Sequence, residues 1–288
     1  MTATAVVGRP APLKAVGWAL LFLGTGFALT LAFALAIAFL SGTPIGGEPG
    51  PRFLVIQTVA GLLAYGLMTW AIGLRGLRLT PLDLRWAPLE RAGRGFGFGL
   101  LLGAAPAFLA LGLSTLVGGA RFLPDEGDLA AYGTRVGLTA LLLAPAALME
   151  ELMFRGVPQV VLARAFGRLP AILALSTTFA LAHVLNPNGT ALGLVNIALA
   201  GILLGLAFYT PGGLWTAWGA HLGWNTMLAA LDAPVSGHPF AMPMIDYLPG
   251  EPVWLTGGAF GPEGGFLATV AISLASFAAW RRGEGRPA

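Results

Sequence analysis

Two adjacent glutamates and an arginine interrupt an apolar stretch that is long enough to cross a lipid bilayer. Glu150, Glu151 and Arg155 lie within residues 136–162, where most other side chains are apolar. A charged side chain at the centre of a bilayer costs about 2.5–3.5 kcal/mol on insertion scales, and such residues usually have a function and a partner. We therefore expect the partners of these three residues to lie in other apolar segments.

The composition indicates an integral membrane protein. Of the 288 residues, 56% are hydrophobic and 10% are charged, against about 25% charged in soluble domains. We predict a single integral membrane domain over residues 1–288. Cysteine is absent, which excludes disulfides, zinc–thiolate sites, iron–sulfur clusters and cysteine nucleophiles. We attribute the pI of about 9.8 to membrane topology rather than to nucleic-acid binding, because the basic residues gather in particular loops.

The apolar segments predict an all-α polytopic membrane protein with about eight transmembrane helices and a buried polar catalytic cavity. About 20 apolar residues cross the hydrocarbon core, and helices satisfy their backbone groups within lipid. We expect the first segment to be a retained helix rather than a signal peptide, because its apolar run is too long. The predicted spans are 15–40, 53–74, 95–118, 136–162, 168–186, 190–209, 212–231 and 264–280.

The distribution of basic residues predicts the orientation. With eight spans, all of the 16 Lys and Arg residues except Arg52, Arg121 and Arg135 fall on the side of the N-terminus or within the fourth span. Cytoplasmic loops carry the excess of Lys and Arg. We therefore expect a multi-pass protein of the cell membrane (the inner or plasma membrane) with both termini in the cytoplasm.

Glycine pairs four residues apart predict close contacts between helices. Gly99 and Gly103 form one such pair, and Gly201 and Gly205 form another. Small residues at this spacing let helix backbones approach each other. The glycine-rich run 93–103 therefore indicates helix packing rather than phosphate binding.

Helical spacing separates the two glutamates. Glu151 and Arg155 are four residues apart and can pair on one helix face. Adjacent helical residues point about 100° apart, so we expect that Glu150 and Glu151 do not face one target together. Glu150 is left without a local partner, and it is the carboxylate available for chemistry.

Further polar residues in later spans reach a similar depth. The fourth and fifth spans should turn near Gly167, with Glu150 17 residues before it and His183 16 residues after it. Both would then lie roughly 25 Å from the turn. His221 and Asn225 are four residues apart in the seventh span and share a face. We expect these four side chains to converge on one buried pocket.

The remaining polar candidates have simpler interpretations. Asn196 is a further polar residue within the sixth span. Asn188, Gly189 and Thr190 follow Pro187 and indicate a turn. His238 lies in a loop rich in Pro and Gly, where we expect it to be exposed.

The four converging residue types favour hydrolysis at an acyl centre, most plausibly a peptide bond. A buried carboxylate beside a histidine can activate water as a general base, and a His–Asn pair can donate hydrogen bonds to an oxyanion. Alternatively, Glu150, His183 and His221 could hold a zinc ion whose bound water is the nucleophile. The H-E-x-x-H pattern of many zinc proteases is absent.

Three motifs on separate spans resemble the CPBP family, the CAAX-protease and bacteriocin-processing (Abi) membrane endopeptidases. The family pattern consists of E-E-x-x-x-R, F-x-x-x-H and H-x-x-x-N/D. Here these motifs run from Glu150 to Arg155, from Phe179 to His183 and from His221 to Asn225. The core of the resemblance covers residues 136–231, and the flanking spans are similar only in hydropathy.

The resemblance implies a role for each motif residue. Glu150 would activate the water with help from His183, while His221 and Asn225 would form the oxyanion site. Structural support would come from Glu151, Arg155 and Phe179.

The family has been described both as metal-dependent and as metal-free. We favour no cofactor, with zinc as the alternative, because a first shell of one carboxylate and two histidines shows no evident second shell.

The resemblance also implies the partners: the lipid bilayer and a peptide or protein substrate that can be membrane-associated, without nucleic acid. Eukaryotic relatives remove the last three residues of prenylated CaaX proteins, whereas bacterial relatives are associated with peptide maturation or bacteriocin immunity. Two other functions stay open. The chain could be a non-catalytic scaffold or immunity protein of the same family, or a transporter that relays protons through buried Glu and His residues. The inverted repeats of many transporters are not evident in the sequence.

Overall fold

The computed structural model describes residues 11–44 and 51–283, and most of the regular structure within these ranges is helical. This confirms the predicted all-α class. The short elements are a π-helical turn η1 (Thr69–Gly76) that continues α2, the helix α9 (Val253–Thr256), the 3₁₀ turns η2 (Gly258–Phe260) and η3 (Pro262–Gly264), and the strands β1 (Arg121–Pro124) and β2 (Ile245–Leu248). The longer helices are α1 (Pro12–Leu40), α2 (Pro51–Met68), α3 (Leu89–Gly118), α4 (Leu129–Arg155), α5 (Val157–Phe166), α6 (Arg168–Ala182), α7 (Ala191–Ala207), α8 (Leu214–Ala230) and α10 (Phe266–Arg282).

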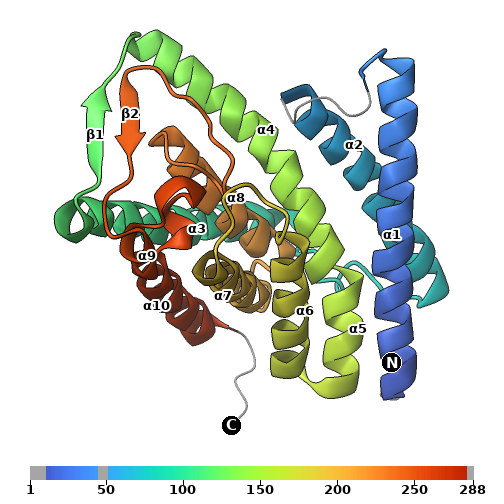
Figure 1. Ribbon diagram of the computed structural model, residues 1–288. Helices are drawn as coiled ribbons and strands as arrows, with labels where there is room; N and C mark the ends of the chain where they lie inside the picture. Colours follow the sequence, from blue (N-terminus) through green and yellow to red (C-terminus); the bar gives the residue numbers. More distant parts are fainter. Residues whose placement is uncertain (1–10, 45–50, 284–288) are drawn as a thin grey trace.

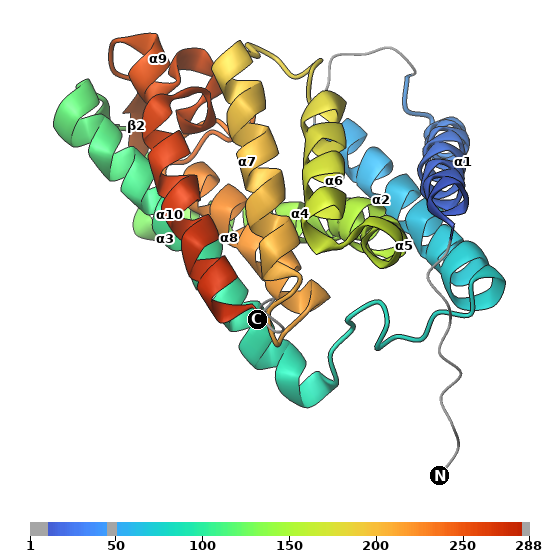
Figure 2. The same ribbon diagram turned by 90° about the horizontal axis from the view of Figure 1, so that it is seen from below.

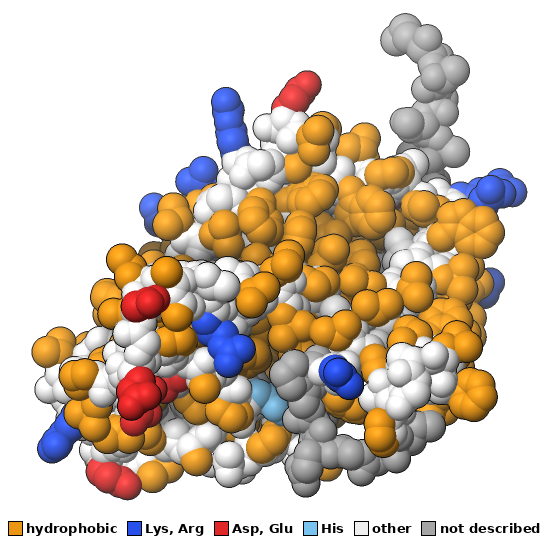
Figure 3. All heavy atoms as spheres, turned by 90° about the horizontal axis from the view of Figure 1, so that it is seen from above, with side chains coloured by type: hydrophobic (Ala, Val, Ile, Leu, Met, Phe, Trp, Pro, Cys, Tyr) orange, Lys and Arg blue, Asp and Glu red, His pale blue; other side chains and the backbone are white. Residues whose placement is uncertain are grey.

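The surface and the helix lengths are those of a polytopic membrane protein. Four helical segments are long and apolar enough to cross a bilayer: Pro12–Leu40, Arg52–Gly76, Leu89–Gly118 and Leu129–Phe166. The helices α6 and α7 are apolar but have only 15 and 17 residues. Large hydrophobic side chains are exposed along the long helices, among them Leu20, Phe27 and Leu31 of α1, as expected for a surface in contact with lipid. Charged side chains are few and scattered on the face seen in Figure 3. Each predicted span overlaps a helix, but the exact number of eight spans stays a prediction.

The helices form two groups with α4 between them. The pair α1 and α2 lies along one side, while α3, α7, α8 and α10 form the opposite side (Figures 1 and 2). The antiparallel strands β1 and β2 pair Arg121 with Leu248 and Pro124 with Ile245, and they lie at the end of the molecule where α4 begins (Figure 1). The helix α4 therefore runs through the middle of the fold and carries the Glu motif into it.

Helix α8 is fixed in place by a seam of glycines against α3. A Cβ on Gly99 would lie 2.3 Å from the Thr216 carbonyl oxygen, and one on Gly103 would lie 1.9 Å from the Ala220 oxygen. The contact is reciprocal, because a Cβ on Gly223 of α8 would lie 2.3 Å from a backbone oxygen of α3. Backbone-to-backbone packing of this kind confirms the interpretation of the run 93–103 as helix packing.

The second glycine pair has the same function between α6 and α7. A Cβ on Gly201 would lie 2.9 Å from Ser176, and one on Gly205 would lie 2.9 Å from Ile172. The helix α6 ends at His183, the histidine of the second motif. The close contact between α6 and α7 therefore fixes the position of His183 along the axis of α7.

Two predicted helix boundaries are wrong. The segment 136–162 is not one helix, because α4 ends at Arg155 and α5 begins at Val157 after a break at Gly156. The segment 168–186 is helical only to Ala182, and His183 is the C-cap residue rather than a mid-span residue. The expected turn at Gly167 is present, with a φ of 94° that glycine adopts readily.

Candidate active site

A cavity of about 820 Å³ opens among α2, α4, α6, α8 and the segment 235–241. Its lining has a mostly apolar part towards α1 and α2, which includes Phe27, Phe53 and Leu138 and also the polar side chains of Gln57 and Arg135. The rest of the lining includes the four predicted reacting residues Glu150, His183, His221 and Asn225, together with Glu263. The three motifs therefore meet at one cavity, as helical spacing predicted.

Glu150 presents a carboxylate oxygen to the cavity without a hydrogen-bond partner among the described residues. Its Oε2 atom is buried and lies 3.7 Å from Nε2 of His221 and 4.0 Å from Nε2 of His183. A buried polar atom without a partner costs about 1–3 kcal/mol, more if it is charged. An oxygen in this position is ready to accept a hydrogen bond from a water or a substrate group in the cavity.

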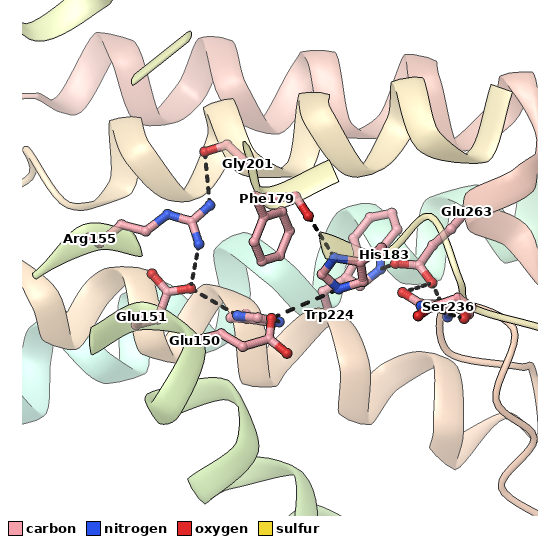
Figure 4. A network of polar contacts seen from close by, with 11 residues as sticks. Glu150, Glu151, Arg155, Phe179, His183, Gly201, Trp224, Ser236 and Glu263 are labelled. Atoms are coloured by element: carbon pink, nitrogen blue, oxygen red, sulfur yellow. Dashed lines mark hydrogen bonds and ion pairs between the residues drawn. The ribbon is translucent and has the colours of Figure 1, made fainter. Parts of the chain in front are cut away.

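The predicted pairing of Glu151 with Arg155 is confirmed. The Nη1 atom of Arg155 lies 3.2 Å from Oε1 of Glu151, and both side chains are fully buried. The other terminal nitrogen of Arg155 donates to the Gly201 carbonyl at 3.2 Å, and the guanidinium lies 4.6 Å from the ring centre of Phe179. The arginine thus joins α4 to α6 and α7 (Figure 4).

His221 contradicts one expectation about the glutamates. Its Nδ1 lies 2.9 Å from Oε1 of Glu151, while its Nε2 faces Glu150. Both carboxylates therefore address the same imidazole from opposite ends, although they point in different directions from the helix. The expectation was wrong because it considered only the angle between Cα–Cβ directions and neglected the width of a ring with a nitrogen on each side.

His183 takes its orientation from its own helix. Its Nδ1 lies 2.7 Å from the carbonyl oxygen of Phe179, one turn earlier, and its ring packs 4.6 Å from the Phe179 ring. A carbonyl oxygen can only accept, so Nδ1 carries the proton and Nε2 points towards Glu150. The F-x-x-x-H spacing is thereby explained, because Phe179 supplies both a ring contact and the acceptor.

Asn225 is the least constrained of the four predicted residues. It lies one turn beyond His221 on α8 and lines the cavity. Its side chain makes no hydrogen bond with any other described residue, in contrast to Asn196, whose amide donates to backbone carbonyls of Glu263 and Gly265. Asn196 therefore links α7 to the segment around η3.

The three candidate zinc ligands have the right chemistry, and their spacing is slightly wider than a zinc site requires. Zinc bonds of about 2.0–2.2 Å in a tetrahedron place ligand atoms roughly 3.3–3.6 Å apart, whereas Glu150 Oε2 lies 3.7 and 4.0 Å from the two histidine nitrogens. Among the described residues, no cluster of three His, Asp or Glu side chains is arranged to hold a metal ion.

The reason given for a metal-free site needs correction. Both histidines do have a second shell, through Glu151 and the Phe179 carbonyl, as metal-ligating histidines commonly do. Metal independence therefore stays a prediction.

The buried carboxylate of Glu263 was missed by sequence reasoning. Glu263 of η3 is buried, and its carboxylate accepts hydrogen bonds from Trp224 and Ser236. Burial raises the pKa of the Glu263 carboxyl despite these hydrogen bonds. The sequence signal was limited to its position directly before the last predicted span, 264–280.

His238 is exposed as expected, but it also lines the cavity. Partial burial of its ring, together with the neighbouring His183, lowers its pKa.

Comparison with protein families agrees with the motif analysis. Residues 132–227 match the family model described as type II CAAX prenyl endopeptidase, Rce1-like. The matched segment contains all three motifs and confirms the predicted family resemblance over about a third of the chain. Searches of curated proteins and of solved structures gave no match.

Proposed function

We propose that the chain hydrolyses a peptide bond within the membrane with water activated by Glu150 and His183. The match of residues 132–227 to the Rce1-like type II CAAX prenyl endopeptidase family supports this activity. The observation that carries the proposal is the buried Oε2 of Glu150, which accepts no hydrogen bond from any residue that the structure describes and lies 4.0 Å from Nε2 of His183. One water oxygen can bridge this gap with ordinary hydrogen bonds of about 2.7–3.0 Å.

The Nδ1 atoms of the two histidines contact different acceptor groups, and this difference supports different roles for His183 and His221. The Nδ1–H of His183 donates to a neutral carbonyl, and this tautomer leaves the lone pair of Nε2 to accept a hydrogen bond from water. The Nδ1 of His221 instead contacts the carboxylate of Glu151, which stabilises a positive ring. A doubly protonated His221 can donate from Nε2 while Nδ1 remains bonded. We therefore assign His183 to water activation and His221 to hydrogen-bond donation.

The proposed reaction needs only residues of this chain. Glu150 takes a proton from the water molecule while the water oxygen attacks the peptide carbonyl carbon. The resulting oxyanion accepts hydrogen bonds from Nε2 of His221 and from the amide of Asn225, which share a face of α8. When the C–N bond breaks, Glu150 returns its proton to the leaving amine. The products are a new carboxyl terminus and a new amino terminus.

The two-part lining of the cavity supports a substrate with two chemical parts. The polar part would hold the scissile peptide bond, and the apolar part towards Phe27 and Phe53 would hold an apolar group beside it. We propose a membrane-associated peptide or protein substrate, and the test includes farnesylated peptides as one arm.

The proposed orientation places both termini in the cytoplasm of a cell membrane. The turn between α5 and α6, with Arg164 and Arg168 on either side, would then face the cytoplasm, in agreement with the excess of basic residues there. The strands β1 and β2 would lie on the opposite side.

Cleavage of quenched-fluorescent peptides, with and without a farnesyl group, tests the proposal. Wild type is compared with Glu150→Gln, which keeps the shape of the side chain, and with Glu126→Gln, a control at an exposed glutamate near β1. We expect Glu150→Gln to lose activity about 10²–10⁴-fold, as for removal of a general base, with unchanged gel-filtration behaviour. Glu126→Gln should retain wild-type activity.

The other outcomes separate the remaining alternatives. Loss of cleavage with a chelator and recovery with zinc would replace the metal-free mechanism by a zinc-dependent one. A folded wild type that cleaves no peptide would favour a non-catalytic scaffold or immunity protein. Proton-coupled flux in liposomes without cleavage would instead identify a transporter.

A further inference from the structure

Glu263 is a buried carboxylate that the proposed reaction does not use. It lies in η3, and its side chain lines the polar part of the cavity. Both carboxylate oxygens are occupied: Oε1 accepts from Nε1 of Trp224 at 3.1 Å, and Oε2 accepts from the amide and, at 3.0 Å, the hydroxyl of Ser236 (Figure 4). The three donor groups belong to Trp224 and Ser236, which precede Glu263 by 39 and 27 residues.

One of these contacts leads to the oxyanion side of the site. Trp224 directly precedes Asn225 in α8 and follows His221 by three residues. Its indole nitrogen is tied to Glu263, so the rotation of this part of α8 is fixed from η3 as well as from the glycine seam with α3.

The other contact leads to the water-activating side. The carbonyl oxygen of Ser236 accepts from the side chain of Asn186 at 3.0 Å. The backbone N–H of Asn186 in turn donates to the carbonyl oxygen of His183 at 3.0 Å. Through Ser236 and Asn186, Glu263 is linked to the turn that carries His183.

Glu263 is itself held firmly. The side-chain nitrogen of Asn196 donates to the backbone carbonyls of Glu263 at 2.8 Å and of Gly265 at 2.9 Å, and Thr269 donates to the side-chain oxygen of Asn196 at 2.6 Å. The turn η3 is therefore anchored on α7 and α10, and it can serve as a fixed point for the two sides of the cavity.

Burying a carboxylate is unfavourable unless donors surround it, and burial raises the pKa of this one. An apolar side chain would pack at lower cost if filling space were the only requirement. On the basis of the proposed function, we propose that Glu263 is a positioning residue that fixes the distance between His183 and the His221–Asn225 pair.

Replacement by glutamine tests this inference with little change in volume. A carboxylate accepts from all three donors, whereas an amide must direct its NH₂ group at one of them, and two facing donors repel. A displacement of about 1 Å at a reacting group can reduce the rate about 10²-fold. We expect Glu263→Gln to lower kcat about 10–100-fold, with KM within about twofold of wild type and the same fraction of folded protein.

A double-mutant cycle with Trp224→Phe distinguishes positioning from a general effect on folding. This variant keeps an aromatic ring but removes the indole donor. If Glu263 acts through Trp224, the loss of kcat in the double variant will be smaller than the product of the two single losses. The matched controls are Glu126→Gln and Trp254→Phe, both at exposed positions.

The outcomes for Glu263 and for the proposed function are separable. An active wild type, an inactive Glu150→Gln and a fully active Glu263→Gln would overturn the positioning role and leave the proposed function intact. A loss of activity that follows only a loss of folded protein, with kcat per folded molecule unchanged, would overturn it as well. An inactive folded wild type would overturn both.

Discussion

Replacing Arg155 by methionine should be strongly destabilising, because it leaves Glu151 charged and buried. Arg155 makes two hydrogen bonds of 3.2 Å, to Glu151 and Gly201, and contacts the Phe179 ring at 4.6 Å. Each hydrogen bond with a charged group contributes about 1.5–3 kcal/mol, and the ring contact about 0.5–2 kcal/mol. Recovered hydration of the guanidinium offsets part of this sum. We expect a net loss of about 3–5 kcal/mol, the range for breaking a buried pair.

Removing both charges should cost less than removing one. In the double variant Glu151→Gln/Arg155→Met, the glutamine oxygen can still accept from Nδ1 of His221, and neither replaced residue is left as an unpaired buried charge. We expect this variant to lose only about 1–2 kcal/mol, because neutral replacements of buried pairs are often tolerated. Each single variant should therefore be less stable than the double variant.

Reversible unfolding in mixed micelles, with an increasing fraction of denaturing detergent, measures these differences. Arg135→Met is the matched control, because Arg135 is an exposed arginine on the same helix and should change stability by less than about 0.5 kcal/mol. Additive losses in the double variant, or a loss below about 1 kcal/mol for Arg155→Met, would refute the assignment of Arg155 and Glu151 as a coupled buried pair.

Three further predictions concern other parts of the fold. Gly103→Ala should destabilise the protein by about 1–3 kcal/mol through overpacking, whereas Gly112→Ala on the same helix, where a Cβ meets open space, should be neutral or stabilising in the same unfolding assay. Hydrogen bonds from Thr80 and the charge of Arg164 outweigh the effect of burial and lower the pKa of Asp83, so its stabilisation is present above the unfolded pKa of about 3.9 and is lost as the pH falls through the folded value. Thermal unfolding from pH 6 to pH 3 should therefore show a difference between wild type and Asp83→Asn, below about 1 kcal/mol for this partly exposed pair, that decreases towards the acid end. Phe179→Leu should lower kcat in the peptide assay while KM changes less, because the ring that packs against His183 is lost. An unchanged kcat would contradict this role of the ring.

The convergence of the site was predictable because it depends on regular geometry. Four-residue spacing places Glu151 beside Arg155 and His221 beside Asn225, and equal distances from the turn at Gly167 bring Glu150 and His183 to one depth. These relations follow from rise and rotation per residue. They hold despite the break at Gly156 because Glu150 lies before that break.

The remaining features depend on contacts between segments that no local spacing specifies. Glu263 meets Trp224 across 39 positions, and the loop between them has no periodic pattern. The end of α6 was missed because the residues around His183 stay apolar until Asn186 and Pro187. The shared use of His221 by two carboxylates depends on side-chain reach, which a helical projection does not contain.

The shortness of α6 has a consequence for the lipid around the site. Fifteen residues rise about 22 Å, whereas the hydrocarbon layer is about 30 Å thick. In the predicted eight-span topology α6 crosses the bilayer, and local thinning of the bilayer is one way in which such a mismatch is relieved. Because His183 caps this helix, thinning there would bring the headgroup layer and its water close to the carboxylate of Glu150. We therefore expect the thickness of the surrounding membrane to influence how readily the site is hydrated.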